Sequence, residues 1–181
     1  MKIVEPIRDK HTIAVMKQEL KERGEKYYIM FVVGINLGLR INEILSLRVG
    51  DVKGRRETVV YQKKTGKEVA VAFNDELYNA LSDYCQGRNN EEALIPHRSN
   101  KYKSIGRVWA YKVLKSTAER FGIEHIGTHT LRKTCGYHFY NQTKDIATLM
   151  VWFNHDNEAD TLRYIGITRE RIRRAMVDFK I

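Results

Sequence analysis

Residues 57–73, ETVVYQKKTGKEVAVAF, decide the fold class, because the spacing of apolar residues changes here from a helical to an extended pattern. The two halves, ETVVYQ and KEVAVAF, are rich in β-branched and aromatic residues, which favour strands. Between them lies KKTG, a hairpin loop in which Gly66 can adopt a positive φ. We therefore expect an antiparallel hairpin, to which VGDVK at residues 49–53 could add a third short strand.

Helical patterns surround this hairpin on both sides. Asp9 or Thr12 can cap a helix that runs to about Arg23, and Gly24 follows in a position that favours glycine. Further helices are expected from about Glu25 to a break at Gly38, over 41–47, over 75–85 after the cap Asn74, from Ser104 to Phe121, from the cap Thr128 or Thr130 onward, over 144–153, and after Thr168. The sum is one α+β domain over residues 1–181, mainly helical, with a small three-stranded antiparallel sheet.

The composition is that of a globular protein, with 43% hydrophobic and 30% charged residues in a chain of 181. The longest apolar run, YYIMFVV at residues 27–33, is too short to span a membrane, and the N-terminus lacks the apolar segment of a secretory signal. Cys85 and Cys135 are far apart in the sequence, which predicts two packed thiols in a reduced, cytoplasmic setting. We expect no metal and no cofactor.

The net charge of +10 is concentrated in two segments. Residues 98–133 hold nine basic and two acidic side chains, and residues 163–181 hold six basic and two acidic ones. Clustered positive charge suits a polyanion that releases counterions when it is bound. Charge therefore favours nucleic-acid binding, with a mildly basic solvated surface as the alternative.

Two arginine motifs are candidates for binding an anion. In HTLR, His129 and Arg132 are three residues apart and share one face of a helix, where an imidazole can exchange a proton and a guanidinium can grip phosphate oxygens. The alternative is an ordinary surface pair. In GLRINEIL, Glu43 follows Arg40 by three residues, either as a plain salt bridge or as the carboxylate that orients a phosphate-binding arginine.

Two further features remain ambiguous when each is taken alone. Lysines at the tip of the QKKTGK hairpin are ordinarily solvated, but such a lysine can also reach a DNA groove and deliver a proton. In NHDNEADTLRYIG, residues 154–166, Tyr164 follows His155 by nine positions. That tyrosine is either a core aromatic or a nucleophile.

In chain order, these motifs resemble the catalytic domain of the tyrosine recombinases, the phage-integrase family. GLRINEIL resembles the first arginine box of the family, HTLRKT the second, and TLRYIGIT the nucleophile box. KKTGKEVAV resembles the hairpin that carries the family's lysine, which matches Lys64. The resemblance extends from about PIRDK to RYIGIT, nearly the whole chain, and implies the tyrosine-recombinase catalytic fold.

The resemblance implies site-specific DNA recombination without a metal. Tyr164 would attack a DNA phosphorus to give a 3′-phosphotyrosyl link and a free 5′-hydroxyl, while Arg40 and Arg132 neutralise the non-bridging oxygens. Lys64 would protonate the departing 5′-oxygen. The implied catalytic set is Arg40, Lys64, His129, Arg132, His155 and Tyr164, with Glu43 in a supporting role.

Within that set, the two histidines have different implied tasks. His129 is placed to help with the phenolic proton, and His155 would hydrogen-bond a phosphate oxygen. Asn154 stands where the family usually has glycine, and asparagine tolerates the left-handed conformation that a turn needs there.

Double-stranded DNA and other recombinase protomers are the expected partners, and a membrane is not. The side chains expected to contact DNA are Lys63, Lys67, Arg98, Lys101, Lys103, Arg107 and Lys133. RERIRRAMVDF, residues 169–179, resembles the C-terminal segment that docks on a neighbouring protomer in the family. An amphipathic helix packed on its own domain is the alternative.

Most family members carry an additional N-terminal helical domain. The resemblance therefore implies that residues 1–181 are the catalytic domain, without a core-binding or arm-binding domain. Three other functions remain open: a type IB topoisomerase that relaxes supercoiled DNA, a DNA-binding module that has lost its activity, and, less favoured, a metal-dependent nuclease.

Overall fold

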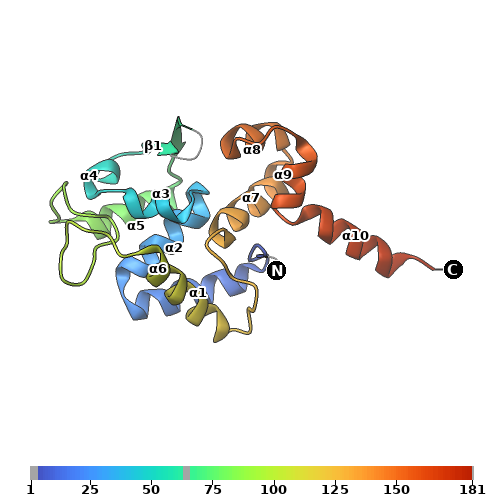
Figure 1. Ribbon diagram of the computed structural model, residues 1–181, viewed down its shortest axis with the longest axis horizontal. Helices are drawn as coiled ribbons and strands as arrows, with labels where there is room; N and C mark the ends of the chain where they lie inside the picture. Colours follow the sequence, from blue (N-terminus) through green and yellow to red (C-terminus); the bar gives the residue numbers. More distant parts are fainter. Residues whose placement is uncertain (1–3, 63–65, 181) are drawn as a thin grey trace.

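The computed structural model describes residues 4–62 and 66–180 (Figure 1). The helices of these ranges are α1 (Lys10–Arg23), α2 (Glu25–Leu37), α3 (Ile41–Ser46), α4 (Val49–Val52), α5 (Asp75–Cys85), α6 (Arg107–Glu119), α7 (Thr130–Thr143), α8 (Ile146–Phe153), α9 (Glu158–Tyr164) and α10 (Ile167–Asp178). The strands are β1 (Glu57–Gln62) and β2 (Lys67–Ala72). Within the described ranges, every helix is too short or too polar to cross a lipid bilayer. The mainly helical α+β fold is confirmed.

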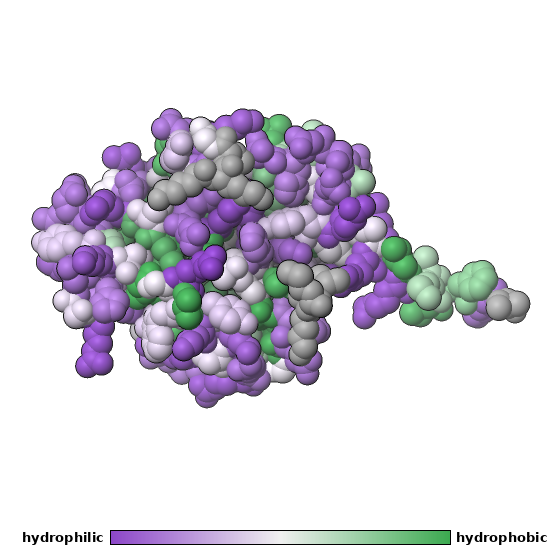
Figure 2. Space-filling model, viewed as in Figure 1, coloured by the Kyte–Doolittle hydropathy of each residue, from purple (hydrophilic) through white to green (hydrophobic). Residues whose placement is uncertain are grey.

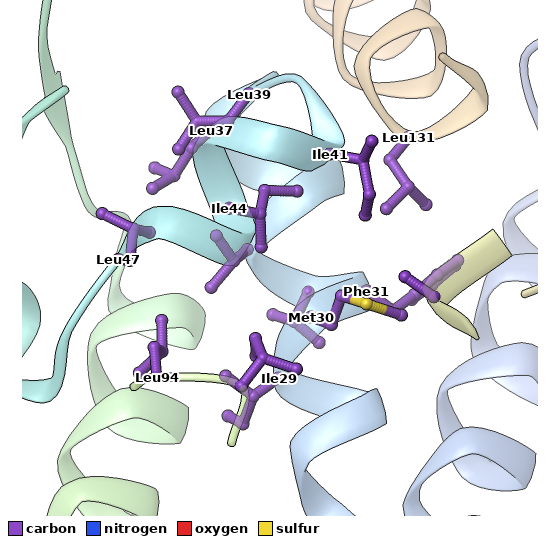
Figure 3. Packing of buried hydrophobic residues seen from close by; sticks show 14 of the residues in the cluster. Ile29, Met30, Phe31, Leu37, Leu39, Ile41, Ile44, Leu47, Leu94 and Leu131 are labelled. Atoms are coloured by element: carbon purple, nitrogen blue, oxygen red, sulfur yellow. The ribbon is translucent and has the colours of Figure 1, made fainter. Parts of the chain in front are cut away.

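The helix α2 forms the centre of the domain, because it is apolar on nearly every side. Its residues from Ile29 to Gly34 are all buried, and α1, α3, α5 and α7 pack around it. Figure 3 shows α2, α3 and α7 meeting in this core, with Phe31, Ile44 and Leu131 among the side chains that fill it. Gly34 permits the close approach of α7, since a Cβ at this position would lie 2.5 Å from Leu131 Cδ1. This packing fixes the start of α7 against the end of α2.

The sheet is a two-stranded antiparallel hairpin. Glu57 lies opposite Ala72, and Gln62 lies opposite Lys67. In the described part of the chain no third strand joins it, so the prediction of a strand over 49–53 was wrong. Val49 and Val52 are three residues apart and both point into the core from the short helix α4. The Asp51 carboxylate accepts the backbone N–H of Arg48 at 2.7 Å, which closes this turn as a helix.

Several helix ends form through the local hydrogen bonds that the sequence predicts. Asp9 accepts the N–H of Thr12 at 2.6 Å, and Asn74 accepts the N–H of Leu77 at 2.9 Å. Gly38 ends α2 with φ of 60°, and Asn154 ends α8 with φ of 50°. Asparagine therefore performs the left-handed turn expected at that position.

Two helix starts differ from the prediction. The helix α6 begins at Arg107 rather than Ser104, because Ser104 pairs with Pro96 in an isolated bridge and donates to the carbonyl of Ile95. The helix α7 begins at Thr130, with His129 instead of a threonine as its cap residue. The hydroxyl of Thr130 accepts the N–H of Gly127 at 2.9 Å, so it closes the turn before the helix.

The C-terminal helices form a second, smaller core. Phe153, Leu162 and Ile165 are buried there, between α7, α8 and α9. The helix α9 was not predicted. It spans seven residues and buries only Thr161 and Leu162, which is too little for an amphipathic pattern in the sequence.

The helix α10 leaves the body of the protein. Figure 1 shows it extending away from α7 and α9 to the C-terminus, and Figure 2 shows hydrophobic surface near its free end. Of its residues only Ile167 is buried, whereas Ile172, Met176 and Val177 are exposed. The alternative, that this helix packs on its own domain, therefore holds only for its first turn, and docking on a neighbouring protomer stays a prediction.

Candidate active site

Arg40 precedes α3, and two side chains fix its guanidinium. Its Nη1 donates to Glu43 Oε1 at 2.8 Å and to Gln62 Oε1 at 3.2 Å. The other carboxylate oxygen of Glu43 accepts the backbone N–H of Arg40 at 2.7 Å. Because Glu43 is only 6% exposed, this ion pair lies largely out of water and orients the guanidinium strongly. The motif is therefore a salt bridge whose carboxylate orients the guanidinium, and phosphate binding by Arg40 stays a prediction.

Arg132 is a buried arginine on α7, with 1% of its surface exposed. It donates from Nη1 to the carbonyl of Gly38 at 2.6 Å and from Nη2 to the carbonyl of Phe153 at 3.1 Å. These carbonyls lie at the C-termini of α2 and α8. The partial negative charge of a helix C-terminus stabilises a buried cation. Burial lowers the pKa of Arg132, although an arginine stays charged at neutral pH. The alternative of an ordinary surface pair with His129 is therefore wrong.

Tyr164 ends α9 with its phenol against the start of α7. Its Oη lies 3.2 Å from Nδ1 of His129. Its ring meets that of His155 edge to face, with the ring centres 5.1 Å apart, and that of Phe153 at 5.9 Å. The residue is half-buried: one side of it packs against the core around Phe153, and the other contacts His129 and His155. It is therefore no ordinary core aromatic.

His155 follows the turn at Asn154. Its Nδ1 lies 3.1 Å from the hydroxyl of Thr161, which fixes the plane of the ring. Burial lowers the pKa of His155, and the positive charges of Arg132 and Arg40 lower it further. The imidazole is therefore largely neutral at pH 7 and carries a single N–H, so it can donate from Nε2 only in the tautomer whose Nδ1 accepts from the Thr161 hydroxyl.

The same two arginines act on Tyr164. Burial raises the pKa of the Tyr164 phenol above its ordinary value, while the charges of Arg132 and Arg40 oppose that rise. The phenol is therefore protonated at pH 7, and its proton needs an acceptor. His129 is the imidazole within reach of it. Both guanidinium groups thus shift the pKa of one histidine and one phenol in the same direction, although the two arginines are distant in the sequence.

A cavity of about 350 Å³ opens beside Arg40 and His129. Tyr164 lines a neighbouring cavity of about 520 Å³, and His129 connects the two because it lines the first and contacts Tyr164. The lining residues of the first cavity are Arg40, Ile41, Asn42, Glu43, Ser46, Tyr61, Arg107, Thr128 and His129. Of these, Tyr61 was missed, although the strand alternation of β1 places it on the exposed face. Asn42, Ser46 and Thr128 carry no sequence signal beyond their proximity to the two motifs.

Lys63 and Lys64 lie outside the described residues, so their roles stay predictions. The hairpin nevertheless reaches the site, because Gln62, the residue before them, contacts Arg40. Lys67, on the other strand, donates to Asn154 Oδ1 at 2.8 Å and so connects β2 with the turn before His155.

The other side chains predicted to contact DNA differ in their surroundings. Arg98, Lys103 and Arg107 are exposed, and Arg107 lines the cavity beside Arg40. Lys101 is also exposed, but it forms an ion pair with Glu92 at 3.0 Å. Lys133 is half-buried beside Tyr164. Among the described residues, no group of three or more His, Cys, Asp or Glu side chains could hold a metal ion.

The fold is shared with solved recombinase structures. The crystal structure of XerA recombinase matches 99% of this chain and 67% of its own, with a TM-score of 0.72 and 16% identity. The structure of XerH site-specific recombinase bound to palindromic difH substrate matches 98% of this chain and 54% of its own, with a TM-score of 0.70 and 15% identity. These likenesses define the architecture as that of a recombinase domain.

The sequence comparisons identify the family. The model of the phage integrase family matches residues 9–171, and the chain belongs to this family. The probable integrase/recombinase YoeC of Bacillus subtilis (strain 168) is 40% identical over 97% of this chain and 96% of its own length. The tyrosine recombinase XerC of Herpetosiphon aurantiacus is 26% identical over 74% of this chain, which spans 45% of that relative. The resemblance described from the sequence is confirmed.

Proposed function

We propose that this protein is a site-specific DNA recombinase that cleaves and rejoins DNA through a 3′-phosphotyrosyl intermediate. The observation that carries the proposal is the position of Tyr164, whose Oη lies 3.2 Å from Nδ1 of His129 and whose ring contacts His155, beside the cavity that His129 and Arg40 line. Residues 1–181 would form the catalytic domain. The two buried free cysteines, Cys85 and Cys135, agree with a reduced, cytoplasmic setting.

The proposed first step is attack of the Tyr164 oxygen on the phosphorus of a DNA strand. The phenolic proton passes to His129, a new P–O bond forms to Tyr164, and the P–O5′ bond breaks. Arg40 and Arg132 would neutralise the charge that accumulates on the non-bridging oxygens, which is where fixed cations lower the barrier most. Glu43 and the two helix-end carbonyls hold these guanidinium groups in place before DNA arrives.

The departing 5′-oxygen requires a proton. From the family resemblance we assign this proton to Lys64, on the hairpin whose preceding residue, Gln62, contacts Arg40. His155 would donate a hydrogen bond from Nε2 to a phosphate oxygen, which requires the Thr161 hydroxyl to turn from the carbonyl of Asn157 and donate to Nδ1. The phosphotyrosyl link retains the energy of the broken bond, so a 5′-hydroxyl can attack it and reseal the strand without ATP or a metal.

The proposal predicts covalent trapping on nicked DNA. We would incubate the protein with duplexes whose sequence is randomised around a nick, so that a short 5′-hydroxyl fragment departs after cleavage and the link accumulates. We expect an adduct that resists SDS and disappears with protease, and sequencing of the attached DNA would reveal a preferred site. Absence of any adduct would favour the non-catalytic DNA-binding module.

The same preparation separates the remaining alternatives. Relaxation of supercoiled plasmid without a preferred site in the trapped DNA would favour a type IB topoisomerase. Cleavage that stops with EDTA and leaves no protein on the DNA would favour a metal-dependent nuclease.

The exposed part of α10 supports a protomer partner. Ile172 and Met176 are four residues apart and share one face of a helix that leaves its own domain. We propose that this face docks on a neighbouring copy of the chain in a complex with two DNA sites. The helix would then bury apolar surface that a single copy leaves in water.

Replacing Ile172 and Met176 with serine tests this partner. We expect strand exchange between two sites to fall by about tenfold or more, because two apolar anchors are lost. Trapping on a single nicked duplex should persist, since each active site lies within one chain. A variant that loses trapping as strongly as exchange would show that this helix serves its own domain instead.

A further inference from the structure

Tyr164 has a second neighbour on α7 besides His129. The ammonium of Lys133 lies 5.0 Å from the centre of the Tyr164 ring, over its face. His129 and Lys133 are four residues apart, and the N–H of Lys133 donates to the carbonyl of His129 at 2.9 Å, so both project from one helix face. The start of α7 therefore holds Tyr164 at two points, the hydroxyl and the ring.

The ammonium of Lys133 is itself fixed by the start of the chain. Residues 4–8, which we call the N-terminal strap, cross α7 beside this lysine. Lys133 Nζ donates to the carbonyl of Val4 at 2.9 Å. The N–H of Ile7 donates to the hydroxyl of Thr134 at 2.9 Å, which fastens the strap to the same helix. A half-buried ammonium with a carbonyl partner is held in one position, because losing that partner would leave the charge poorly solvated.

The strap also holds the residues that follow Tyr164. The carboxylate of Glu5 accepts from Arg8 at 2.6 Å and from Arg169 of α10 at 2.8 Å. Arg8 Nη2 lies 3.5 Å from the carbonyl of Gly166, two residues after Tyr164. The strap thus connects two elements that adjoin Tyr164: the helix α7, against which its phenol lies, and the junction between α9 and α10, which follows it in the chain.

We propose that Lys133 is a positioning residue, which together with the N-terminal strap holds the Tyr164 ring in the orientation that attack on phosphorus requires. This inference rests on the proposed role of Tyr164 as nucleophile. A displacement of about 1 Å at a reacting group can cost about 100-fold in rate, so a contact that fixes the ring has a large effect without touching DNA. The charge pattern of the sequence instead predicts Lys133 as a DNA contact.

A positioning role of Lys133 changes the rate of adduct formation, whereas a DNA contact changes the Kd. With a duplex selected by the trapping experiment, we would measure the Kd and its salt dependence, and separately the single-turnover rate of adduct formation at saturating protein. We expect Lys133→Met to lower that rate by about 10- to 100-fold with an unchanged Kd. Lys133→Arg should restore most of the rate, since it keeps a cation over the ring.

The matched control is Lys21→Met. Lys21, on α1, lies 5.5 Å from the ring centre of Tyr28, so it is the same kind of pair in another part of the fold. Its replacement should leave the rate unchanged. Glu5→Gln, which weakens the strap, should lower the rate in the same direction as Lys133→Met but by less. A wild-type rate in Glu5→Gln would show that the N-terminal strap does not help to hold the Tyr164 ring.

The opposite pattern would overturn the positioning role. If Lys133 contacts a phosphate, Lys133→Met raises the Kd, reduces the slope of log affinity against log salt concentration by about one, and leaves the rate of adduct formation in bound complexes unchanged.

A DNA-free measurement keeps the inference testable even if no adduct forms. In protein labelled with ¹³C-tyrosine, the NMR signal that Tyr164→Phe removes should be sharp in the wild type and broadened or split in Lys133→Met. An unchanged signal would contradict the proposal independently of the activity.

Discussion

Tyr164→Phe should abolish the covalent protein–DNA adduct, with a rate below about one thousandth of the wild type. The variant removes the one oxygen that would attack phosphorus and keeps the ring that contacts Phe153 and His155. Its unfolding free energy should stay within about 1 kcal/mol of the wild type, because a half-buried hydroxyl with one hydrogen bond contributes little net stability. Gel separation of adducts after SDS, together with urea denaturation, measures both quantities.

The matched control is Tyr84→Phe. Tyr84, on α5, is also half-buried, and its hydroxyl donates to the carbonyl of Leu94 at 2.9 Å, away from the candidate site and the N-terminal strap. This variant should form the adduct at the wild-type rate. Persistent adduct in Tyr164→Phe would mean that another nucleophile acts.

Arg132→Lys should lower the rate of adduct formation by about 100- to 1,000-fold, although the positive charge is kept. A lysine has no planar fork and cannot hold the carbonyls of Gly38 and Phe153 while it also binds phosphate oxygens. A buried carbonyl that loses its donor costs about 1–3 kcal/mol, so the variant should also be less stable by about that amount. Single-turnover trapping and urea denaturation separate the two effects.

Arg171→Lys provides the comparison for Arg132→Lys. Arg171 is an exposed arginine on α10 whose Nη2 donates to the hydroxyl of Tyr140 at 3.0 Å. That replacement should change neither the rate nor the stability appreciably. Wild-type rates in Arg132→Lys would show that charge alone is sufficient and that the fixed geometry of Arg132 is not used.

The parts of the fold that were predicted from the sequence depend on neighbours close in the chain. Asp9 and Asn74 cap helices through bonds to residues three positions later, and Gly38 ends α2 through its own backbone freedom. The pairing of Arg40 with Glu43 is of the same kind. A sequence pattern records such contacts directly, because both partners lie within one turn.

The features that were missed depend on partners distant in the chain. Arg132 is buried because the ends of α2 and α8 supply carbonyls from 94 and 21 residues away, and a spacing of three from His129 indicates nothing about burial. Lys133 contacts Val4, 129 residues earlier. The predicted third strand was wrong because of a contact close in the chain. The backbone N–H of Arg48 donates to the Asp51 carboxylate, and this local bond favours a helix over the strand that Val49 and Val52 prefer.

The proposed catalytic residues therefore follow from the family resemblance rather than from sequence spacing alone. HxxR and RxxE spacings occur in many helices, and each left two interpretations open. The structure brings His129, Arg132 and His155 together around the phenol of Tyr164 and places Arg40 within electrostatic range of it. Lys64 remains a prediction, because it lies outside the described residues.

The most direct test of the account is the chemical nature of the trapped link. Digestion of the adduct with protease and nuclease, followed by mass spectrometry, identifies both the modified side chain and the DNA end attached to it. We predict a phosphodiester between the Tyr164 oxygen and a 3′-nucleotide, with a free 5′-hydroxyl on the released fragment. A link to any other residue, or to a 5′-phosphate, would contradict the central claim that Tyr164 cleaves DNA through a 3′-phosphotyrosyl intermediate.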